Sequence, residues 1–139
     1  MRIFCIANQK GGVGKTTTTV NLAAGLALLG KRVLLVDLDP QGNATMGSGI
    51  DKRALDPSVY DVLLEGASIA ETRRPSPQGG YDVLGANREL AGAEVELVKL
   101  ERRETRLKTA LEAVASEYDF VLADCPPSLS MLTLNGLCT

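Results

Sequence analysis

The sequence contains no histidine and only three cysteines in 139 residues. Histidine is the commonest zinc ligand and the commonest general base, so its absence excludes both roles and leaves carboxylates as the available bases. Cys5, Cys125 and Cys138 are odd in number and far apart, which does not fit a disulfide framework. We therefore expect all three to pack as small apolar side chains.

Long hydrophobic runs are also missing. No stretch approaches the ~20 apolar residues of a membrane span, and the apolar run at residues 1–6 is too short for a signal peptide. Aromatic residues make up only 4%, so the core must consist mainly of Leu, Val, Ile and Ala. The net charge of −2 does not indicate a nucleic-acid-binding surface. These features predict a cytoplasmic protein whose length fits one domain.

Apolar segments of strand and helix type alternate at the start of the chain. The pattern predicts a strand over 3–7, a helix over 16–29 and a strand over 33–36, whose continuous apolar run is typical of a parallel strand buried on both faces. Gly30 stands where the helix should be capped. One face of that helix carries five apolar residues: Val20, Ala23, Ala24, Ala27 and Leu28. These elements predict a right-handed βαβ unit.

The rest of the chain continues this alternation. Glycine and proline predict loops over 40–57 and around 75–80, separated by a short helix over 59–64. Strands are predicted over 81–84 and 118–123, a long helix over 88–116, and a last helix from residue 128 or 129. The long helix has apolar residues at spacings of three and four: Leu97, Leu100, Leu107, Leu111 and Val114.

A glycine-rich loop connects the first strand to the first helix. It reads Gln9-Lys10-Gly11-Gly12-Val13-Gly14-Lys15-Thr16-Thr17. Its glycines let backbone N–H groups converge on phosphate oxygens, the helix dipole and Lys15 add positive charge, and the Thr16 hydroxyl suits Mg²⁺. The usual phosphate loop has glycine at position 9, whereas this chain has Gln9 and a second lysine, Lys10.

Two carboxylates follow the second strand, in the sequence Asp37-Leu38-Asp39-Pro40-Gln41-Gly42-Asn43. Residues two apart on an extended segment point the same way, and ligands of open α/β sheets bind beyond the carboxyl ends of the strands. Asp37 and Asp39 are therefore expected to face the ligand of the phosphate loop and to hold Mg²⁺ through water or orient an attacking water. The alternative is a strand that simply ends in a polar turn.

A third carboxylate, Asp124, ends the strand predicted over 118–123, and Cys125-Pro126-Pro127-Ser128 follow it. In P-loop proteins an aspartate at this place helps to hold Mg²⁺. The segment after the two prolines lies where a γ-phosphate sensor is expected.

Together these three segments resemble the three signatures of the ParA/MinD group of deviant P-loop ATPases, and within that group the chromosome-partitioning ParA (Soj-type) proteins. The stretches 58–64 and 132–137 are similar to that family as well. The resemblance implies a P-loop NTPase fold, a three-layer α/β/α structure with a mostly parallel sheet. Residues 1–139 would form the N-terminal, incomplete portion of a single ParA-type nucleotide-binding domain.

The resemblance also implies an ATPase that uses ATP and Mg²⁺, with Lys15 on the β- and γ-phosphates. Thr16 would bind Mg²⁺ directly, and Asp124 and possibly Asp37 through water. Lys10 would reach across an ATP-bound homodimer to the phosphates on the other subunit, and Asp39 would position the hydrolytic water. The residues implied to bind the ATP phosphates are Lys10, Gly11, Gly12, Val13, Gly14, Lys15, Thr16 and Thr17.

Further partners implied by the resemblance are a ParB-like centromere-binding protein and non-specific DNA, with a nucleoid-associated location and no membrane. Two other functions stay open: a MinD-like, membrane-associated division-site ATPase, and a dethiobiotin-synthetase-like metabolic ligase. The charged run 99–108 does not itself indicate a DNA site, because its lysines and arginines alternate with glutamates, as on a solvated helix face.

Members of this family are longer than this chain, which ends shortly after its third signature. We expect it to be an N-terminal fragment or a truncated reading frame that lacks the far strands, the adenine pocket and the basic residues for DNA. Its first strand would then be left as an exposed apolar edge, and the chain alone would be poorly stable or inactive.

Overall fold

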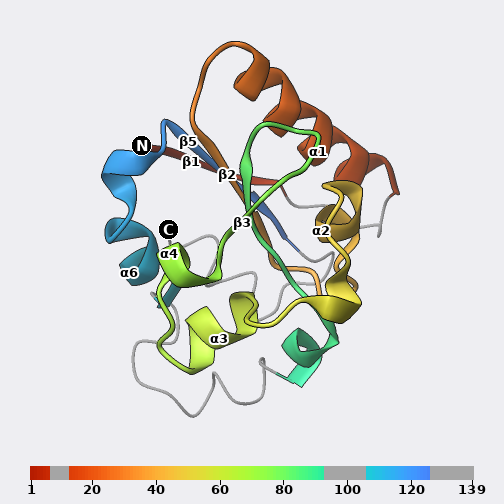
Figure 1. The fold of residues 1–139 in the computed structure, drawn as a ribbon, viewed down its shortest axis with the longest axis vertical. Coiled ribbons are helices and arrows are strands. Elements are labelled where there is room, and N and C mark those ends of the chain that lie inside the picture. The colour runs from red at the N-terminus through yellow and green to blue at the C-terminus, as the bar shows by residue number, and fades with distance from the viewer. Residues whose placement is uncertain (7–12, 93–105, 126–139) are drawn as a thin grey trace.

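The computed structural model describes residues 1–6, 13–92 and 106–125, with only the backbone for residues 13–17. At its centre is a five-stranded sheet of order β1-β5-β2-β4-β3 (Figure 1). The first four of these strands are mutually parallel, and β3 runs antiparallel to β4 at the edge. The strand bounds are β1 Arg2–Ile6, β2 Val33–Asp37, β3 Arg74–Pro75, β4 Asp82–Leu84 and β5 Phe120–Asp124.

Helices cover both faces of this sheet, as the three-layer prediction requires (Figure 1). On one face lie α1 (Val13–Leu28) and α2 (Asn43–Gly47). On the other lie α3 (Val59–Leu64), α4 (Ile69–Thr72) and α6 (Arg106–Glu112). Short 3-10 turns connect these elements: η1 Lys52–Ala54, η2 Arg88–Gly92 and η4 Ala115–Glu117. The α/β fold class is confirmed.

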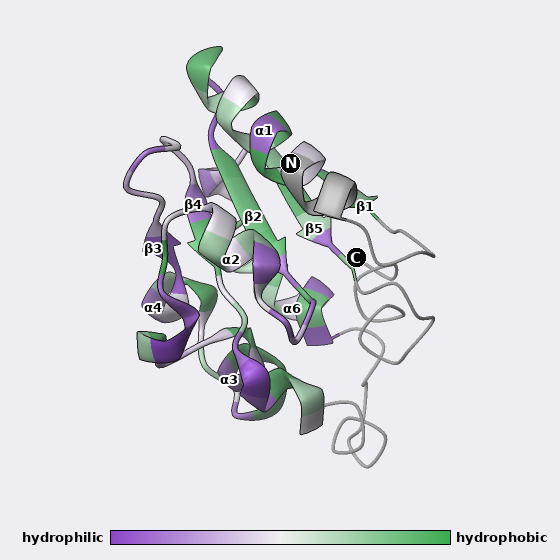
Figure 2. Ribbon diagram, turned by 90° about the vertical axis from the view of Figure 1, so that its right-hand side faces the viewer, coloured by the Kyte–Doolittle hydropathy of each residue, from purple (hydrophilic) through white to green (hydrophobic). Residues whose placement is uncertain are grey.

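The two hydrophobic cores follow from the alternation of side chains along β2. Val33 and Leu35 pack under α1 and α2, whereas Leu34 and Val36 pack under α3 and α6. All four are buried, and Figure 2 shows β2 as hydrophobic along its length. The apolar run 33–36 therefore serves both faces, as expected of an inner parallel strand.

Helix α1 ends where the sequence predicted. Gly30 has a φ of +81°, and its N–H donates to the carbonyl of Ala27 (3.0 Å) while that of Lys31 donates to Leu26 (3.1 Å). This pair of bonds is a Schellman cap, which needs a left-handed residue. The predicted buried face was wrong at one position, because Leu28 lies in the last turn and is 88% exposed. Leu26 packs against the core in its place.

Other sequence predictions need correction in the loops. The segment 40–57, predicted as loop, contains α2 and η1, and β3 precedes the loop predicted around 75–80. The helix predicted over 88–116 begins as η2 and ends as α6 at Glu112, with residues 93–105 outside the described part. The last helix, predicted from residue 128 or 129, also lies outside it. The helix over 59–64 is confirmed and begins at a capping box of Ser58 and Asp61.

Within the described residues β1 pairs with β5 alone and forms one edge of the sheet. Phe4 is 47% exposed there, and its ring stacks on that of Phe120 with centroids 6.2 Å apart. The same described part has no helix that combines the length and the apolar character needed to cross a membrane.

Candidate nucleotide site

The second and third predicted signatures meet at the carboxyl edge of the sheet, and β1, which precedes the first, ends beside them. Ile6, Asp124 and Asp37 are neighbours in register at the ends of β1, β5 and β2. The glycine-rich loop follows β1, and helix α1 begins at Val13. The register therefore brings the second and third signatures together and starts the first one beside them.

Several predicted phosphate-binding residues cannot be placed in this geometry. Lys10, Gly11 and Gly12 lie outside the described residues. For Val13, Gly14, Lys15, Thr16 and Thr17 the structure describes the backbone, which forms the first turns of α1, and not the side chains. Their contacts with phosphate stay predictions.

Asp37 and Asp124 form a pair of fully buried carboxylates on adjacent strands. Burial raises the pKa of Asp37 to about 7, and the nearby charge of Asp124 adds to the rise. Hydrogen bonds from Thr45 and from the Asp39 backbone oppose it. Two buried acids side by side are costly unless a cation or a proton compensates them. This set of oxygens suits a hard divalent cation or an ammonium group.

Asp124 is tied to the helix that the phosphate loop opens. The hydroxyl of Thr19, on α1, donates to Asp124 Oδ1 at 3.2 Å, and both residues are fully buried. The backbone on either side is fixed too, because Leu38 N donates to Asp124 O (2.9 Å) and Cys125 N donates to Ile6 O (3.0 Å). Asp124 thus has a fixed position between β1, β2 and α1.

Asp39 lies in a different setting from Asp37. Strand β2 ends at Asp37, so the alternation assumed from the sequence does not extend to Asp39. Asp39 is half-buried in a turn, where its Oδ1 accepts from Gln41 N (3.0 Å) and its carbonyl from Gly42 N (2.8 Å). The alternative interpretation, a strand ended by a polar turn, therefore describes the backbone here. Asp39 nevertheless lies at the carboxyl edge, two residues beyond the buried acid pair.

The roles of Gly42, directly before α2, and of Thr45, within α2, were not predicted from the sequence. Gly42 has a φ of +65°, and a Cβ there would lie 2.8 Å from the carbonyl oxygen of Ala86. Thr45 is fully buried and hydrogen-bonds to Asp37. No periodic pattern could have revealed them, because α2 has only five residues. The Gly42 position inside the second signature was the one available signal.

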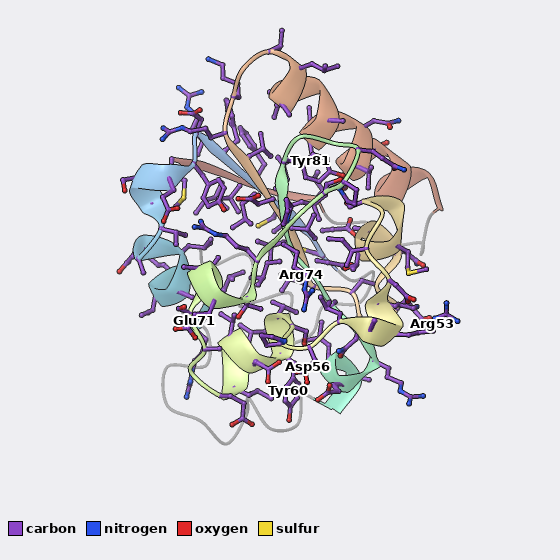
Figure 3. All side chains as sticks on the ribbon, viewed as in Figure 1. Arg53, Asp56, Tyr60, Glu71, Arg74 and Tyr81 are labelled. Carbon is purple, nitrogen blue, oxygen red and sulfur yellow. The ribbon has the colours of Figure 1, made fainter. Side chains whose placement is uncertain are left out.

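An open groove of about 720 Å³ lies beside this turn. Its lining consists of residues 52–56 and 87–89. Lys52 lies at the boundary, because its ammonium donates to the Gln41 carbonyl. In Figure 3 Arg53 points outward at the rim, and Asp56 lies near Arg74. The Nη2 atom of Arg74 donates to the backbone carbonyl of Asp56 at 3.0 Å. The groove adjoins the carboxyl edge but does not include the acid pair.

Within the described residues no group of three or more cysteines, aspartates and glutamates is placed to hold a metal ion. The two buried acids would need ligands from elsewhere to complete a cation site. A phosphate-bound ion that also uses the hydroxyl at the start of α1 would meet that need.

The model of a protein family described as an AAA domain matches residues 1–139, the whole chain. The chain belongs to this family. Among its curated relatives in the family are the sporulation initiation inhibitor protein Soj of Bacillus subtilis (56% identical) and the chromosome-partitioning protein ParA of Caulobacter vibrioides (48% identical). The two comparisons cover 98% and 99% of this chain, and 54% and 52% of the relatives. The chain therefore spans about half the length of these relatives.

Solved structures of the family match the fold. Cobyrinic acid a,c-diamide synthase from Mycobacterium smegmatis, with a bound ATP analog and magnesium, has a TM-score of 0.94 at 47% identity. That comparison covers 99% of this chain and 56% of the other. A Borrelia burgdorferi putative plasmid partition protein bound to AMPPNP has a TM-score of 0.85 at 30% identity, over 99% and 58% of the two chains. The P-loop NTPase fold and the ParA/Soj resemblance are confirmed.

Proposed function

We propose that the chain is the ATP-binding part of a ParA-type molecular switch that hydrolyses ATP with Mg²⁺ in chromosome or plasmid partitioning. One observation carries this proposal. The buried acid pair Asp37 and Asp124 lies at the end of the strands next to the helix opened by the phosphate loop, and Thr19 of that helix bonds to Asp124. The names of the relatives and the nucleotides in the related structures agree with it.

Each residue of the site has a separate role in the proposed hydrolysis. Lys15 and the backbone of residues 11–14 would hold the phosphates, and Thr16 and Asp124 would hold Mg²⁺, Asp124 through water. A Mg²⁺ ion held there would supply positive charge to the phosphates, which is the main requirement of phosphoryl transfer. Asp39 orients the attacking water, a role that its half-buried place beside the acid pair permits. Asp37, whose two oxygens already accept three hydrogen bonds, holds the turn and contacts Mg²⁺ at most through water.

The switch would be a homodimer on ATP, with Lys10 acting across the interface. The proposed partners are a ParB-like centromere-binding protein and non-specific DNA, which would place the switch on the nucleoid in the cytoplasm. The chain spans about half the length of the named relatives, and we assign none of its residues to DNA.

A second function deserves a test because one related structure is named for a synthase. A synthase of this kind activates a substrate carboxylate with ATP, whereas a partitioning switch needs only water. Turnover of ATP without any added carboxylate would favour the switch. Turnover that depends on a carboxylate co-substrate would favour the synthase.

The central experiment measures ATP hydrolysis and nucleotide-dependent dimerisation of Lys10→Ala, Lys15→Ala and Asp39→Ala variants. Lys15→Ala should lose nucleotide binding, and Asp39→Ala should bind ATP but hydrolyse it at least tenfold more slowly. Lys10→Ala should lose dimerisation. A matched control is Glu112→Ala, which removes an exposed carboxylate on α6. Normal hydrolysis by Asp39→Ala would contradict its role, and dimerisation of Lys10→Ala on ATP would remove the cross-subunit assignment.

A further inference from the structure

A chain of buried hydrogen bonds connects α2 to the turn that carries Asp39. Thr45 donates to Asp37 Oδ2 twice, from its backbone N (2.9 Å) and from its hydroxyl (2.7 Å). The other oxygen of that carboxylate, Oδ1, accepts from the backbone N–H of Asp39 at 3.0 Å. A single carboxylate thus joins a threonine on one side to the backbone of Asp39 on the other.

The Thr45 hydroxyl has its direction fixed by a third bond. It accepts from the backbone N–H of Ala86 at 2.9 Å, just beyond β4. An amide can only donate, so the hydroxyl proton is committed to Asp37. Thr45, Asp37 and Ala86 are each 0% exposed, so no water competes for these bonds. Buried bonds to a charged acceptor are among the stronger and more directional kind.

Close packing holds the threonine in this orientation. A Cβ added to Gly85 would lie 3.1 Å from the Thr45 methyl carbon, so the backbone at Gly85, directly after β4, lies close to that methyl. Gly42, at the other end of the turn, lies against the carbonyl of Ala86. The turn is therefore held against the residues that follow β4 at Gly42 and at Thr45, and Asp39 lies between Asp37 and the first of these two points.

We propose that Thr45 is a positioning residue for ATP hydrolysis: its hydroxyl orients the Asp37 carboxylate, which holds the backbone of Asp39 and so sets where the Asp39 side chain stands. This inference rests on the proposed function, because it assumes that Asp39 orients the attacking water. Misplacement of such a group by about 1 Å can cost on the order of 100-fold in rate. Nucleotide binding, which relies on the phosphate loop, should not depend on Thr45.

The test compares Thr45→Val with Thr45→Ser. Valine keeps the shape and removes the hydroxyl, whereas serine keeps the hydroxyl and removes the methyl. We expect Thr45→Val to lower kcat at saturating MgATP by at least about tenfold, with the Kd of a fluorescent ATP analogue changed less than about threefold. Thr45→Ser should retain most of the wild-type kcat. Equal losses in both variants, or a loss confined to the Kd, would overturn the positioning role.

A second readout does not use activity. Amide hydrogen exchange should show the N–H groups of Asp39 and Ala86 protected in the wild-type chain and the Ser variant, and less protected in Thr45→Val. If Thr45→Val does not fold, the wild-type chain still decides: exchange of both amides as fast as in an exposed loop would overturn the proposal. A protected amide together with normal hydrolysis by Asp39→Ala would instead reject the role proposed for Asp39, and with it the positioning role of Thr45, and would leave the hydrogen-bond chain as a structural feature.

Discussion

Replacement of Gly42 by alanine should destabilise the fold more than the same change at other left-handed glycines. Gly42 has a φ of +65°, a conformation that costs an L-residue roughly 1–2 kcal/mol. The new Cβ would also lie 2.8 Å from the backbone oxygen of Ala86 and 2.8 Å from Lys52 Cδ. The lysine carbon can move aside. The Ala86 oxygen cannot, since its peptide segment follows β4 and its N–H is bound to Thr45.

The clash therefore adds about 1–3 kcal/mol, the usual cost of overpacking a rigid site. Summed with the conformational cost, we expect Gly42→Ala to lower the free energy of unfolding by about 2–5 kcal/mol. A typical domain has only about 5–15 kcal/mol in total, so a loss of this size is large. Urea unfolding followed by circular dichroism measures it, with an unchanged m-value showing that the unfolded state is the same.

Gly66 provides the matched control. Its φ is +74°, and an added Cβ would have nothing within 4 Å. Gly66→Ala therefore carries the conformational cost without the clash, and it should lose only about 1–2 kcal/mol. The difference between the two variants isolates the contact with Ala86. Losses that agree within about 0.5 kcal/mol would refute the reasoning that the second signature is seated against the end of β4.

Three further predictions concern stability. The folded-state pKa of Asp37, about 7, lies above its unfolded value of 3.8. Its contribution to the free energy of unfolding is therefore fully present below pH 4 and is lost as pH rises through 7. A carbon-13 carboxyl titration of Asp37 by NMR with a midpoint near 4 would contradict this. Tyr118→Phe should cost about 1–2 kcal/mol in urea unfolding, because its hydroxyl donates to Asp82 (2.6 Å) and accepts from Arg73 (2.9 Å); an unchanged unfolding midpoint would show that these bonds contribute nothing. Leu28→Ala should cost under about 0.5 kcal/mol in the same assay, since Leu28 is 88% exposed, and a loss above 2 kcal/mol would mean that something covers it.

The central strands could be predicted from the sequence because their burial leaves a direct trace in composition. Val33–Val36 is apolar at every position, and it packs into both cores. The cap at Gly30 could be predicted too, since it depends on one residue type at one place. The exposure of Leu28 could not be predicted, because the last turn of α1 packs Leu26 and Ala27 against the core and leaves Leu28 88% exposed. Helical periodicity predicts which residues share the apolar face of a helix, and it does not predict which of them are packed against the sheet.

In the candidate site, too, some residues could be predicted from the sequence and others could not. Asp37 and Asp124 could be predicted, since each ends an apolar strand and parallel strands end at one edge. Thr45 could not, because a short helix has no period and a buried threonine looks like any other threonine in the sequence.

Thr45, which could not be predicted, and the two predicted aspartates, Asp37 and Asp124, nevertheless belong to one physical arrangement. A buried acid pair is tolerated only if a cation, hydrogen bonds or a proton compensate its charge. Three hydrogen bonds favour the charged form of Asp37, but burial outweighs them and raises its pKa to about 7. Asp124 has a threonine of α1 as a donor. The hydrogen bonds to Asp37 thus come from its own turn and from α2, whereas Asp124 accepts one from the helix that the phosphate loop opens. This asymmetry makes Asp124 the better candidate for contact with a cation and gives Asp37 the task of holding Asp39.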